Sequence, residues 1–326
     1  MILCCGEALI DMLPVKSAQG QPCFMPCPGG SPYNVAIALA RLVVPTAFLS
    51  PLSTDFFGDQ LVSTLVREGV DVSLVRRVAK PTTLGFVQLE DSKEPQYAFF
   101  FNDTADRSMT PQDLPVELAP EINCLQFGSI SLTMEPGAGA IGTLVAREAS
   151  RIVVSFDPNV RPSMIPDRKT YLCNFRNWAQ AATIIKVSAA DLSYLFPGGD
   201  TSESMEQLAT VALETRGQRP LLIVITLGGE GSLAFLHSAD TRRQATADGF
   251  QVQLADTIGA GDTFHSGLLA WLQRENRLSF GGLASLSEGD LVAMLRYGNA
   301  CAALACTRSG ADPPTKKALD DFLTKK

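Results

Sequence analysis

An acidic residue directly after a Gly-Ala-Gly turn is the strongest chemical signal in the sequence. The run DTIGAGDTF at 256–264 leads into a helical pattern. Two glycines around an alanine allow a tight turn, in which backbone N–H groups converge at the start of the helix, where the helix dipole also favours an anion. The pattern predicts phosphoryl transfer, with Asp262 as the base that takes a proton from an attacking hydroxyl. Gly259, Ala260 and Gly261 would bind the moving phosphoryl group. The alternative is that Asp262 only caps the helix and the glycines only make the turn.

A second glycine pair near the start of the chain favours the chemical interpretation. Gly29 and Gly30 open the segment SPYNVA, which leads into another helix. A diglycine lets a ligand approach the backbone closely. Asn34 lies at the start of the same helix and carries both a donor and an acceptor, which suits it to binding hydroxyl groups. Each signal alone is weak, but the two together indicate one site for a hydroxyl compound and a phosphoryl group.

Three further loops add polar groups at the ends of predicted strands. Asp11 follows the first strand, the run DPNVR at 157–161 follows another, and the run TLGGEG at 226–231 follows a third. Ligands of open α/β sheets bind outside the carboxyl ends of the strands, so these loops can converge on one crevice. Each of them could instead be an ordinary turn.

The elements that must position these residues alternate along the chain. Short apolar runs predict strands over 1–5, 46–49, 124–127, 152–156, 183–187 and 221–226. Helical patterns occupy 34–42, 57–68, 140–149, 204–215 and 264–272. Continuous apolar strands separated by helices indicate a parallel sheet that is covered on both faces. We therefore expect an α/β fold with a doubly wound, mostly parallel sheet.

Two stretches break this alternation. Residues 11–27 and 84–101 contain alternating or aromatic segments that follow each other without a helix, which is typical of hairpin strands in a small separate sheet. Because both precede core helices, they could meet as one lid over the strand ends. The apolar run at 98–101 would pack on the main domain or join a partner subunit. We expect a core of residues 1–10, 28–83 and 102–326 and a small β lid of residues 11–27 and 84–101.

The composition excludes several classes of protein. The chain has 27 Lys and Arg against 34 Asp and Glu, a net charge of -7 and no extended basic stripe, so no nucleic-acid partner is expected. It contains no apolar stretch of the roughly 20 residues needed to cross a bilayer. The start, MILCCGEALIDM, has no basic residue ahead of its short apolar run. We therefore expect a cytoplasmic protein without a membrane partner.

One motif spells a dinucleotide-binding fingerprint in the wrong context. The run GAGAIG spans 137–142, and Asp157 stands twenty residues after its first glycine, as in an NAD-dependent dehydrogenase. Such a loop begins almost directly at the end of a strand, whereas residues 129–136 intervene here. The sequence also has no phosphate loop ending in Gly-Lys-Ser or Gly-Lys-Thr, which excludes the P-loop architecture.

The two glycine motifs together resemble the paired signatures of the ribokinase-like, or PfkB-type, carbohydrate kinases. These are GGSPYNVAIALARL at 29–42 and DTIGAGDTF at 256–264. The likeness extends from GEALIDMLP at 6–14 to NACAALACTRSGA at 299–311 and so covers nearly the whole chain. The resemblance implies a doubly wound sheet with a small β lid, ATP and Mg²⁺ as cofactors, and a sugar as substrate.

The resemblance also implies roles for individual residues. In such kinases the residue that matches Asp262 is the catalytic base, and the backbone of the Gly-Ala-Gly turn neutralises charge on the moving phosphoryl group. The sugar would be held by Asp11, Gly29, Gly30, Asn34, Asp106, Asn159 and Arg161. ATP would be held by Lys186, Ser188, Thr226, Gly228, Gly229 and Gly231, with its adenine near Asn299 and Ala303.

Metal ions belong to the same expectation. Many members carry Asn-x-x-Glu for the water shell of Mg²⁺, at the place where this chain has the run SAAD at 188–191. Asp191 would hold Mg²⁺ through water, and the ion would neutralise the β- and γ-phosphate oxygens of ATP. The resemblance also allows a monovalent cation such as K⁺ near the turn at 309–311.

Within the family, the chain looks most like bacterial fructokinases, which makes fructose the expected sugar. The GEALID opening, the Ala105-Asp106 pair and the DPNVR loop carry this likeness. Kinases of 2-keto-3-deoxygluconate share the Asp-Pro-Asn-x-Arg loop and are the alternative, with Arg161 for the carboxylate of an acid sugar. Phe101 stands where both groups often have an arginine, and Arg107 follows it.

Two further interpretations stay open. The chain could be a catalytically silent sugar-sensing module, because a fold alone does not establish an activity. It could also form a homodimer through the lid. His265 follows Phe264 on the predicted helix and is interpreted as an ordinary helix residue rather than as a substrate contact.

Overall fold

The strands that the sequence predicts are all present in the fold. The computed structural model describes residues 1–88, 96–239 and 241–325. Its strands are β1 (Ile2–Cys5), β2 (Leu9–Lys16), β3 (Pro22–Gly29), β4 (Thr46–Leu49), β5 (Pro51–Ser53), β6 (Arg76–Val78), β7 (Thr83–Gln88), β8 (Gln96–Phe100), β9 (Cys124–Gly128), β10 (Val153–Asp157), β11 (Ile184–Ser188), β12 (Leu221–Thr226), β13 (Gly231–Ser238) and β14 (Thr241–Asp248). The six predicted core strands are β1, β4, β9, β10, β11 and β12, and their ends differ from the prediction by at most one residue.

The predicted helices are also present, and they begin up to four residues earlier than expected. The helices are α1 (Ser31–Arg41), α2 (Phe56–Arg67), α3 (Gly137–Glu148), α4 (Arg168–Ala181), α5 (Ala189–Leu195), α6 (Thr201–Leu213), α7 (Ala260–Arg274), α8 (Phe280–Ala284), α9 (Glu288–Ala305) and α10 (Lys316–Leu323). Their first turns are rich in small and polar residues, which carry no apolar periodicity. Among the helices of the described residues, none combines the length and the apolar character needed to cross a membrane.

The large sheet has eight strands in the order β14-β13-β12-β11-β10-β9-β1-β4 among the described residues. The strands from β12 to β4 are parallel, and β13 and β14 continue the sheet as an antiparallel edge. This edge hairpin was not predicted, because β14 is mostly polar and forms no apolar run. The predicted doubly wound, mostly parallel α/β fold is thus confirmed.

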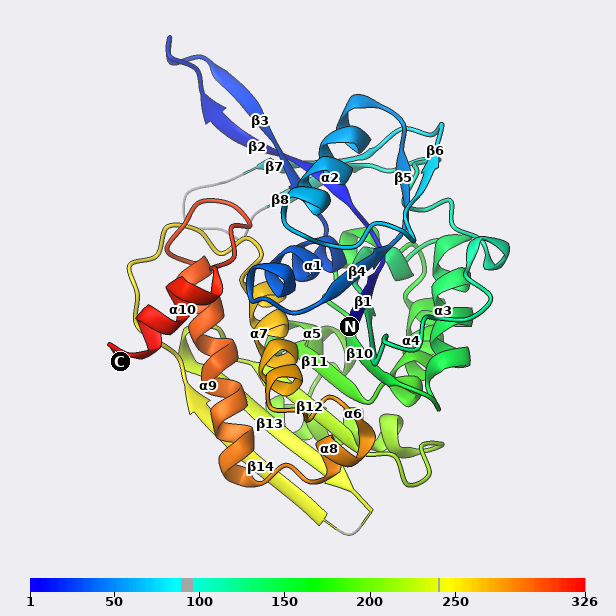
Figure 1. Ribbon diagram of the computed structural model, residues 1–326, viewed down its shortest axis with the longest axis vertical. Helices are drawn as coiled ribbons and strands as arrows, with labels where there is room; N and C mark the ends of the chain where they lie inside the picture. Colours follow the sequence, from blue (N-terminus) through cyan, green and yellow to red (C-terminus); the bar gives the residue numbers. More distant parts are fainter. Residues whose placement is uncertain (89–95, 240, 326) are drawn as a thin grey trace.

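Helices cover both faces of the large sheet (Figure 1). Ile2 and Cys4 of β1 pack in one core with residues of α1, α7 and α9. Leu3 and Cys5 of the same strand pack in a second core with residues of α3, α4 and α6. Successive side chains of a strand point to opposite faces, so a continuous apolar strand is buried on both sides. The run GAGAIG lies inside α3, so it does not form the strand-end loop of a dinucleotide site.

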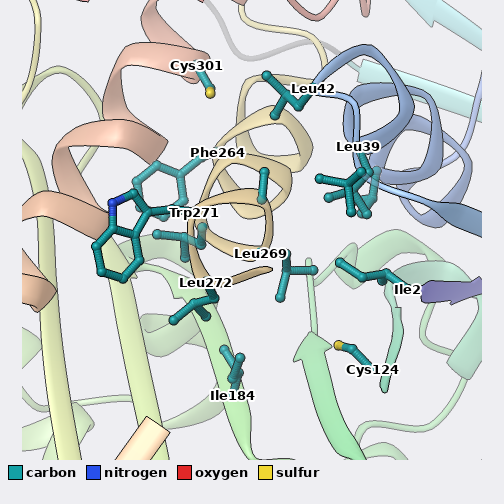
Figure 2. Close-up of a cluster of buried hydrophobic side chains, with 14 of the residues drawn as sticks. Ile2, Leu39, Leu42, Cys124, Ile184, Phe264, Leu269, Trp271, Leu272 and Cys301 are labelled. Carbon is teal, nitrogen blue, oxygen red and sulfur yellow. The ribbon is translucent and has the colours of Figure 1, made fainter. Parts of the chain in front are cut away.

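Helix α7 is buried along most of its length in the first core. Figure 2 shows Phe264 and Trp271 of α7 in one cluster with Leu39 of α1, Cys301 of α9 and Ile184 of the sheet. Burial of one such large apolar side chain stabilises the fold by about 1.5–3 kcal/mol. A Cβ atom at Gly267 would lie 2.9 Å from the Cys301 sulfur, so glycine lets α7 and α9 approach closely. The N-terminus of α7 is therefore held on a rigid platform.

The small sheet has the order β3-β2-β7-β8, and it projects above α1 in Figure 1. Strands β2 and β3 form one hairpin and β7 and β8 another, as predicted, and β2 pairs with β7 in parallel. The first hairpin spans 9–29, slightly more than the predicted segment 11–27. The division into core and lid stays a prediction, and residues 89–95 of the predicted segment 84–101 lie outside the described residues.

Candidate active site

Asp262 lies in the first turn of α7, and both of its carboxylate oxygens accept hydrogen bonds from α1. The Ser31 hydroxyl donates to Oδ1 over 2.6 Å, and the Asn34 side-chain amide donates to Oδ2 over 2.9 Å. The N-cap of α7 is Gly259, and the cap has no side-chain hydrogen bond. Asp262 therefore does not cap its own helix. The structure brings it together with Asn34, as the two glycine motifs indicate.

A small cavity of about 80 Å³ opens beside this carboxylate. We call it the inner cavity. It is lined by Glu7, Leu9, Asp11, Gly30, Ser31, Asn34, Phe99, Ser129, Ile130, Asn159, Arg161, Ile258, Gly259 and Asp262. Most of the predicted sugar-binding residues belong to this lining. Asp11 and the loop at 157–161 thus converge on one crevice, as expected for an open α/β sheet, whereas no residue of the loop at 226–231 is in this lining.

Asp11 of β2 is held between two glycines at the edge of the inner cavity. A Cβ atom at Gly29 would collide with the Asp11 carboxylate, and a Cβ atom at Gly85 would lie 3.1 Å from Oδ1. Gly29 therefore contacts Asp11, which lines the cavity, but Gly29 itself is not in the lining. Burial and the charge of Asp262 raise the pKa of Asp11 to about 7, while Arg161 opposes them. This carboxyl group can titrate near neutral pH.

Glu7 is a site residue that the sequence did not reveal. Its buried carboxylate accepts a hydrogen bond from the backbone N–H of Ser31 over 3.0 Å. Its other oxygen accepts from the backbone and the hydroxyl of Ser131. Gly30 has a φ of 105°, and a Cβ atom there would lie 2.7 Å from the Glu7 carbonyl oxygen. Glu7 thus fixes the diglycine turn at the start of α1.

The Gly-Ala-Gly turn has the shape that the sequence predicts. Gly259 is left-handed, with a φ of 72°, and a Cβ atom there would lie 2.9 Å from the Ala311 Cβ. The first N–H groups of a helix have no acceptor within the helix. The Ala260 N–H donates to the Thr257 carbonyl over 3.2 Å, so the turn already uses this amide. The N–H of Gly261 and the helix dipole are the better placed groups for an anion.

Lys186 of β11 lies directly beneath this turn. Its ammonium group would be 3.1 Å from a Cβ atom at Gly261, and it donates to Asp157 over 2.9 Å as a buried ion pair. Burial acts to lower the pKa of Lys186, but the charges of Asp157 and Asp191 outweigh it and raise the pKa. The lysine therefore stays cationic beside the predicted phosphoryl position. Asp262 has a raised pKa, because burial outweighs the hydrogen bonds from Ser31 and Asn34.

His265 lies one turn after Asp262 and faces the interior. Its Nε2 is 2.7 Å from the Ser155 hydroxyl, and its Nδ1 has no hydrogen-bond partner among the described residues. Burial and the charge of Lys186 lower the pKa of His265 to about 3. The ring is neutral and lies outside the cavity linings, which agrees with its interpretation as a helix residue.

Asp106 is a predicted sugar-binding residue that, like Gly29, is not in the lining of the inner cavity. Its Oδ1 accepts hydrogen bonds from the hydroxyls of Thr83, over 2.6 Å, and Thr104, over 3.0 Å. The neighbouring Arg107 is buried and stacks on the ring of Phe101, 4.5 Å from its centroid. It lies behind Ile130, whose carbonyl oxygen is 3.4 Å from Nη2. In this structure, Asp106 connects β7 to the loop that follows β8.

A larger cavity of about 690 Å³ is also lined by Asp262. We call it the outer cavity. Its lining includes Ser188, Asp191, Thr257, Ile258, Gly259, Gly261 and Asp262. It also shares Asn159 and Arg161 with the inner cavity. The two cavities thus meet at the start of α7, where the predicted base and the predicted phosphoryl site lie.

Asp191 suits a metal ion that is bound through water. Its Oδ1 accepts from the Val160 N–H over 2.7 Å, and its Oδ2 accepts from the Ser188 N–H and hydroxyl over 2.8 and 2.7 Å. A carboxylate offers about four acceptor positions, and these three bonds leave little room for direct coordination. Mg²⁺ usually keeps several of its waters. The arrangement fits a hydrated ion in the outer cavity.

The predicted nucleotide-binding residues form a group beyond Ser188. Thr226 is the neighbour of Ser188 across β11 and β12, and Gly231 faces Asp248 across β13 and β14. Gly228 and Gly229 lie exposed between them. The Asn299 amide donates to the carbonyls of residues 247 and 248 and accepts from the Ser232 hydroxyl. These bonds engage its polar atoms, so Asn299 and Ala303, one turn further along α9, would offer adenine mainly a packing surface.

The residues around the proposed K⁺ turn are connected to the start of α7. Gly310 is left-handed, with a φ of 72°, and its N–H donates to the Asp256 carboxylate over 2.8 Å. The same carboxylate accepts from the N–H groups of Thr257 and Ile258. This connection fixes the approach of the chain to the Gly-Ala-Gly turn.

Comparison with known proteins agrees with this geometry. The family model described as "pfkB family carbohydrate kinase" matches residues 1–318. A fructokinase of Rhizobium leguminosarum bv. trifolii is 38% identical over 291 residues, which cover 89% of this chain and 85% of the relative. The chain therefore belongs to the pfkB family of carbohydrate kinases, which transfer a phosphoryl group to a sugar hydroxyl.

Solved structures of fructokinases share the whole fold. The fructokinase of Xylella fastidiosa with bound ATP has a TM-score of 0.86 and 28% identity, and the match covers 99% of this chain and 98% of that one. The fructokinase of Vibrio cholerae O395, in a form with bound fructose, ADP and calcium ion, has a TM-score of 0.82 at 28% identity, with 99% and 98% covered.

Proposed function

We propose that this protein is an ATP-dependent fructokinase that uses Asp262 as its base. The observation that carries the proposal is the place of Asp262 in the linings of both cavities. A sugar in the inner cavity and ATP in the outer cavity would meet at this carboxylate, next to the start of α7. The names of its relatives support fructose as the sugar, and bound ATP and ADP in related structures support the nucleotide.

The charges of the inner cavity favour a neutral sugar over an acid sugar. Three carboxyl groups line it, on Glu7, Asp11 and Asp262, against the single guanidinium of Arg161. A carboxylate on the substrate would be repelled by most of these groups. Hydroxyls of fructose would instead donate to the carboxylates and accept from Asn34 and Asn159. This balance supports fructose rather than 2-keto-3-deoxygluconate.

The proposed mechanism moves one proton and one phosphoryl group. The hydroxyl oxygen of the sugar forms a bond to the γ-phosphorus while the bond from that phosphorus to the bridging oxygen of ADP breaks. The hydroxyl proton passes to Asp262 late in this step, because a loose transition state depends more on position and charge than on deprotonation. The Gly261 N–H and Lys186 would stabilise the negative charge of the moving group. Mg²⁺, held by Asp191 through water, would neutralise the β- and γ-phosphate oxygens.

The proposal also assigns residues to ATP binding. Ser188, Thr226, Gly228, Gly229 and Gly231 would hold the phosphates and ribose of ATP. The position of the first two at the ends of adjacent parallel strands supports this assignment. A monovalent cation such as K⁺ near the turn at 309–311 is part of the proposal.

A homodimer through the small sheet and a cytoplasmic location complete the proposal. The outer face of the sheet carries Phe24 and Phe100, which are 48% and 63% exposed. Both pack edge to face on Phe86, so a second copy would cover an ordered apolar surface. The cysteines are free thiols, as is usual in a reducing compartment.

A coupled assay of ATP consumption over fructose, ribose, 2-keto-3-deoxygluconate and nucleosides tests the proposed function. We expect fructose to give the highest kcat/KM. If 2-keto-3-deoxygluconate gave the highest kcat/KM, the proposed substrate would be an acid sugar instead of fructose. If none of these acceptors supports ATP consumption, but calorimetry detects sugar binding, the protein would instead be a silent sensing module.

A further inference from the structure

The Ser31 hydroxyl is buried against the Asp262 carboxylate and has no role in capping its own helix. Ser31 is the first residue of α1, and the cap position is Gly30, without a side-chain cap bond. The Ser31 N–H already donates to Glu7, and Pro32 has no N–H to satisfy. The hydroxyl is therefore free to donate to Asp262, over 2.6 Å.

The two donors on Asp262 differ in what they can do next. Both Ser31 and Asn34 line the inner cavity, and the proposed function has Asn34 bind a sugar hydroxyl there. Once that hydroxyl approaches Oδ2, the Asn34 amide and the incoming O–H compete for the same oxygen. The Ser31 hydroxyl donates to Oδ1, and the Ser31 backbone N–H is held by the Glu7 carboxylate. Its bond can persist while the bond from Asn34 is exchanged.

We propose that Ser31 is a positioning residue that keeps Oδ1 of Asp262 hydrogen-bonded while Oδ2 exchanges its partner from Asn34 to the reacting hydroxyl. This inference rests on the proposed function, since it assigns Oδ2 as the atom that takes the proton. A donor fixed on Oδ1 holds the carboxylate plane toward the inner cavity. Glu7 acts on Asp262 indirectly, because its carboxylate holds the backbone N–H of Ser31.

The same bond affects the charge of the base. Burial raises the pKa of Asp262, and the hydrogen bond from Ser31 is the first of the effects that oppose burial. The other charged groups around this carboxylate are Glu7, Asp11, Asp157, Arg161 and Lys186. All of them stay in place when only residue 31 is changed. Loss of the Ser31 donor should therefore raise the pKa of Asp262 further, since a donor stabilises the ionised form.

The test measures the Asp262 carboxyl directly, in the protein without substrates. ¹³C-carboxyl NMR titration of aspartate-labelled wild type and Ser31→Ala, assigned with Asp262→Asn, should give a higher pKa for Asp262 in Ser31→Ala. In kinetics, turnover should fall roughly tenfold, with KM for the sugar nearly unchanged and the acid limb of kcat/KM at higher pH. An Asp262 pKa and a turnover equal to those of wild type would overturn the inference.

A matched pair and a control separate positioning from packing. Ser31→Thr keeps the hydroxyl, and Ser31→Val has the same shape without it, so only Ser31→Val should reproduce the effects of Ser31→Ala. Ser266→Ala removes another buried hydroxyl of α7, which donates to the backbone oxygen of Asp262, and should leave the carboxyl pKa unchanged. Equal pKa values in Ser31→Thr and Ser31→Val would overturn the inference. The titration needs no activity, so it can fail while the proposed function holds, and the sugar assay can fail while the titration succeeds.

Discussion

The two cavities that meet at Asp262 are built in different ways. The inner cavity is small, about 80 Å³, and its carboxylates are held by hydrogen bonds and close glycines before any ligand binds. The outer cavity is much larger, about 690 Å³. Its neighbouring glycines at 228 and 229 are exposed.

This difference separates chemistry from nucleotide binding. Fixed groups on the inner side need little rearrangement during the reaction, so they contribute to the rate. The larger outer side would have to accommodate a flexible, highly charged nucleotide together with its metal ion. Substitutions of the inner side should therefore act mainly on turnover and sugar affinity, and those of the outer side on the dependence on ATP and Mg²⁺.

The largest expected effect is that of Asp262→Asn. Turnover should fall by roughly 100-fold or more, because the base is lost, while KM for the sugar changes little, since the side chain keeps its size. A coupled kinase assay measures both. Calorimetric sugar binding serves as the control, and undiminished turnover would remove Asp262 from its role.

The ion pair beneath the turn should give the next largest effect. Lys186→Met leaves Asp157 buried without its partner, and breaking a buried pair in this way costs about 3–5 kcal/mol of stability. The free energy of unfolding in urea measures the loss. The double variant Lys186→Met/Asp157→Leu should recover much of the stability but not the turnover. Full turnover in a folded Lys186→Met protein would exclude Lys186 from charge stabilisation.

Sugar affinity should depend on pH through Asp11. Its pKa is about 7, so the carboxyl group is ionised above that pH and accepts hydrogen bonds from sugar hydroxyls. As the pH falls through 7, protonation removes this form, and KM for the sugar should rise. Asp11→Asn should raise KM roughly 10- to 100-fold at pH 8 and abolish this pH dependence, while KM for ATP stays constant. A KM profile that is unchanged in Asp11→Asn would assign the titration to another group.

The smallest effect is expected on the outer side. Asp191→Ala removes the capping bonds of α5, which costs about 1 kcal/mol, and should raise the Mg²⁺ concentration for half-maximal activity by a few-fold. Asp290→Ala is a matched control, because Asp290 is the third residue of the Ser287 capping box of α9, as Asp191 is of the Ser188 capping box of α5, but lies outside both cavity linings. Equal Mg²⁺ dependence in the two variants would argue against a metal role for Asp191.

Local patterns were sufficient to predict much of the fold and the centre of the site. Apolar runs predicted the six parallel strands, and the glycine motifs predicted that Asn34 and Asp262 meet. The β13–β14 hairpin was missed, because β14 has no apolar run to mark it, although β13 contains the apolar run LAFL at 233–236. Glycines at turns carry a strong signal in sequence, since they serve backbone shapes that other residues avoid.

The contacts that tune the site could not be predicted, because they join distant parts of the chain. Ser31 and Asp262 are 231 residues apart, and Glu7 and Ser131 are 124 apart. A buried glutamate and an ordinary serine have no local pattern that distinguishes them from other residues of their type. The packing of α1 against α7 brings Ser31 to Asp262, and the pairing of β1 with β9 brings Glu7 near Ser131.

The position of a bound sugar relative to Asp262 tests the central claim most directly. A crystal structure with fructose and a non-hydrolysable ATP analogue would give the distance from the Asp262 carboxylate to the nearest sugar hydroxyl. We predict a distance of about 2.6–3.2 Å, with that hydroxyl oxygen facing the γ-phosphorus at the start of α7. A sugar whose reactive hydroxyl faces the γ-phosphorus but lies beyond the reach of Asp262 would contradict the account.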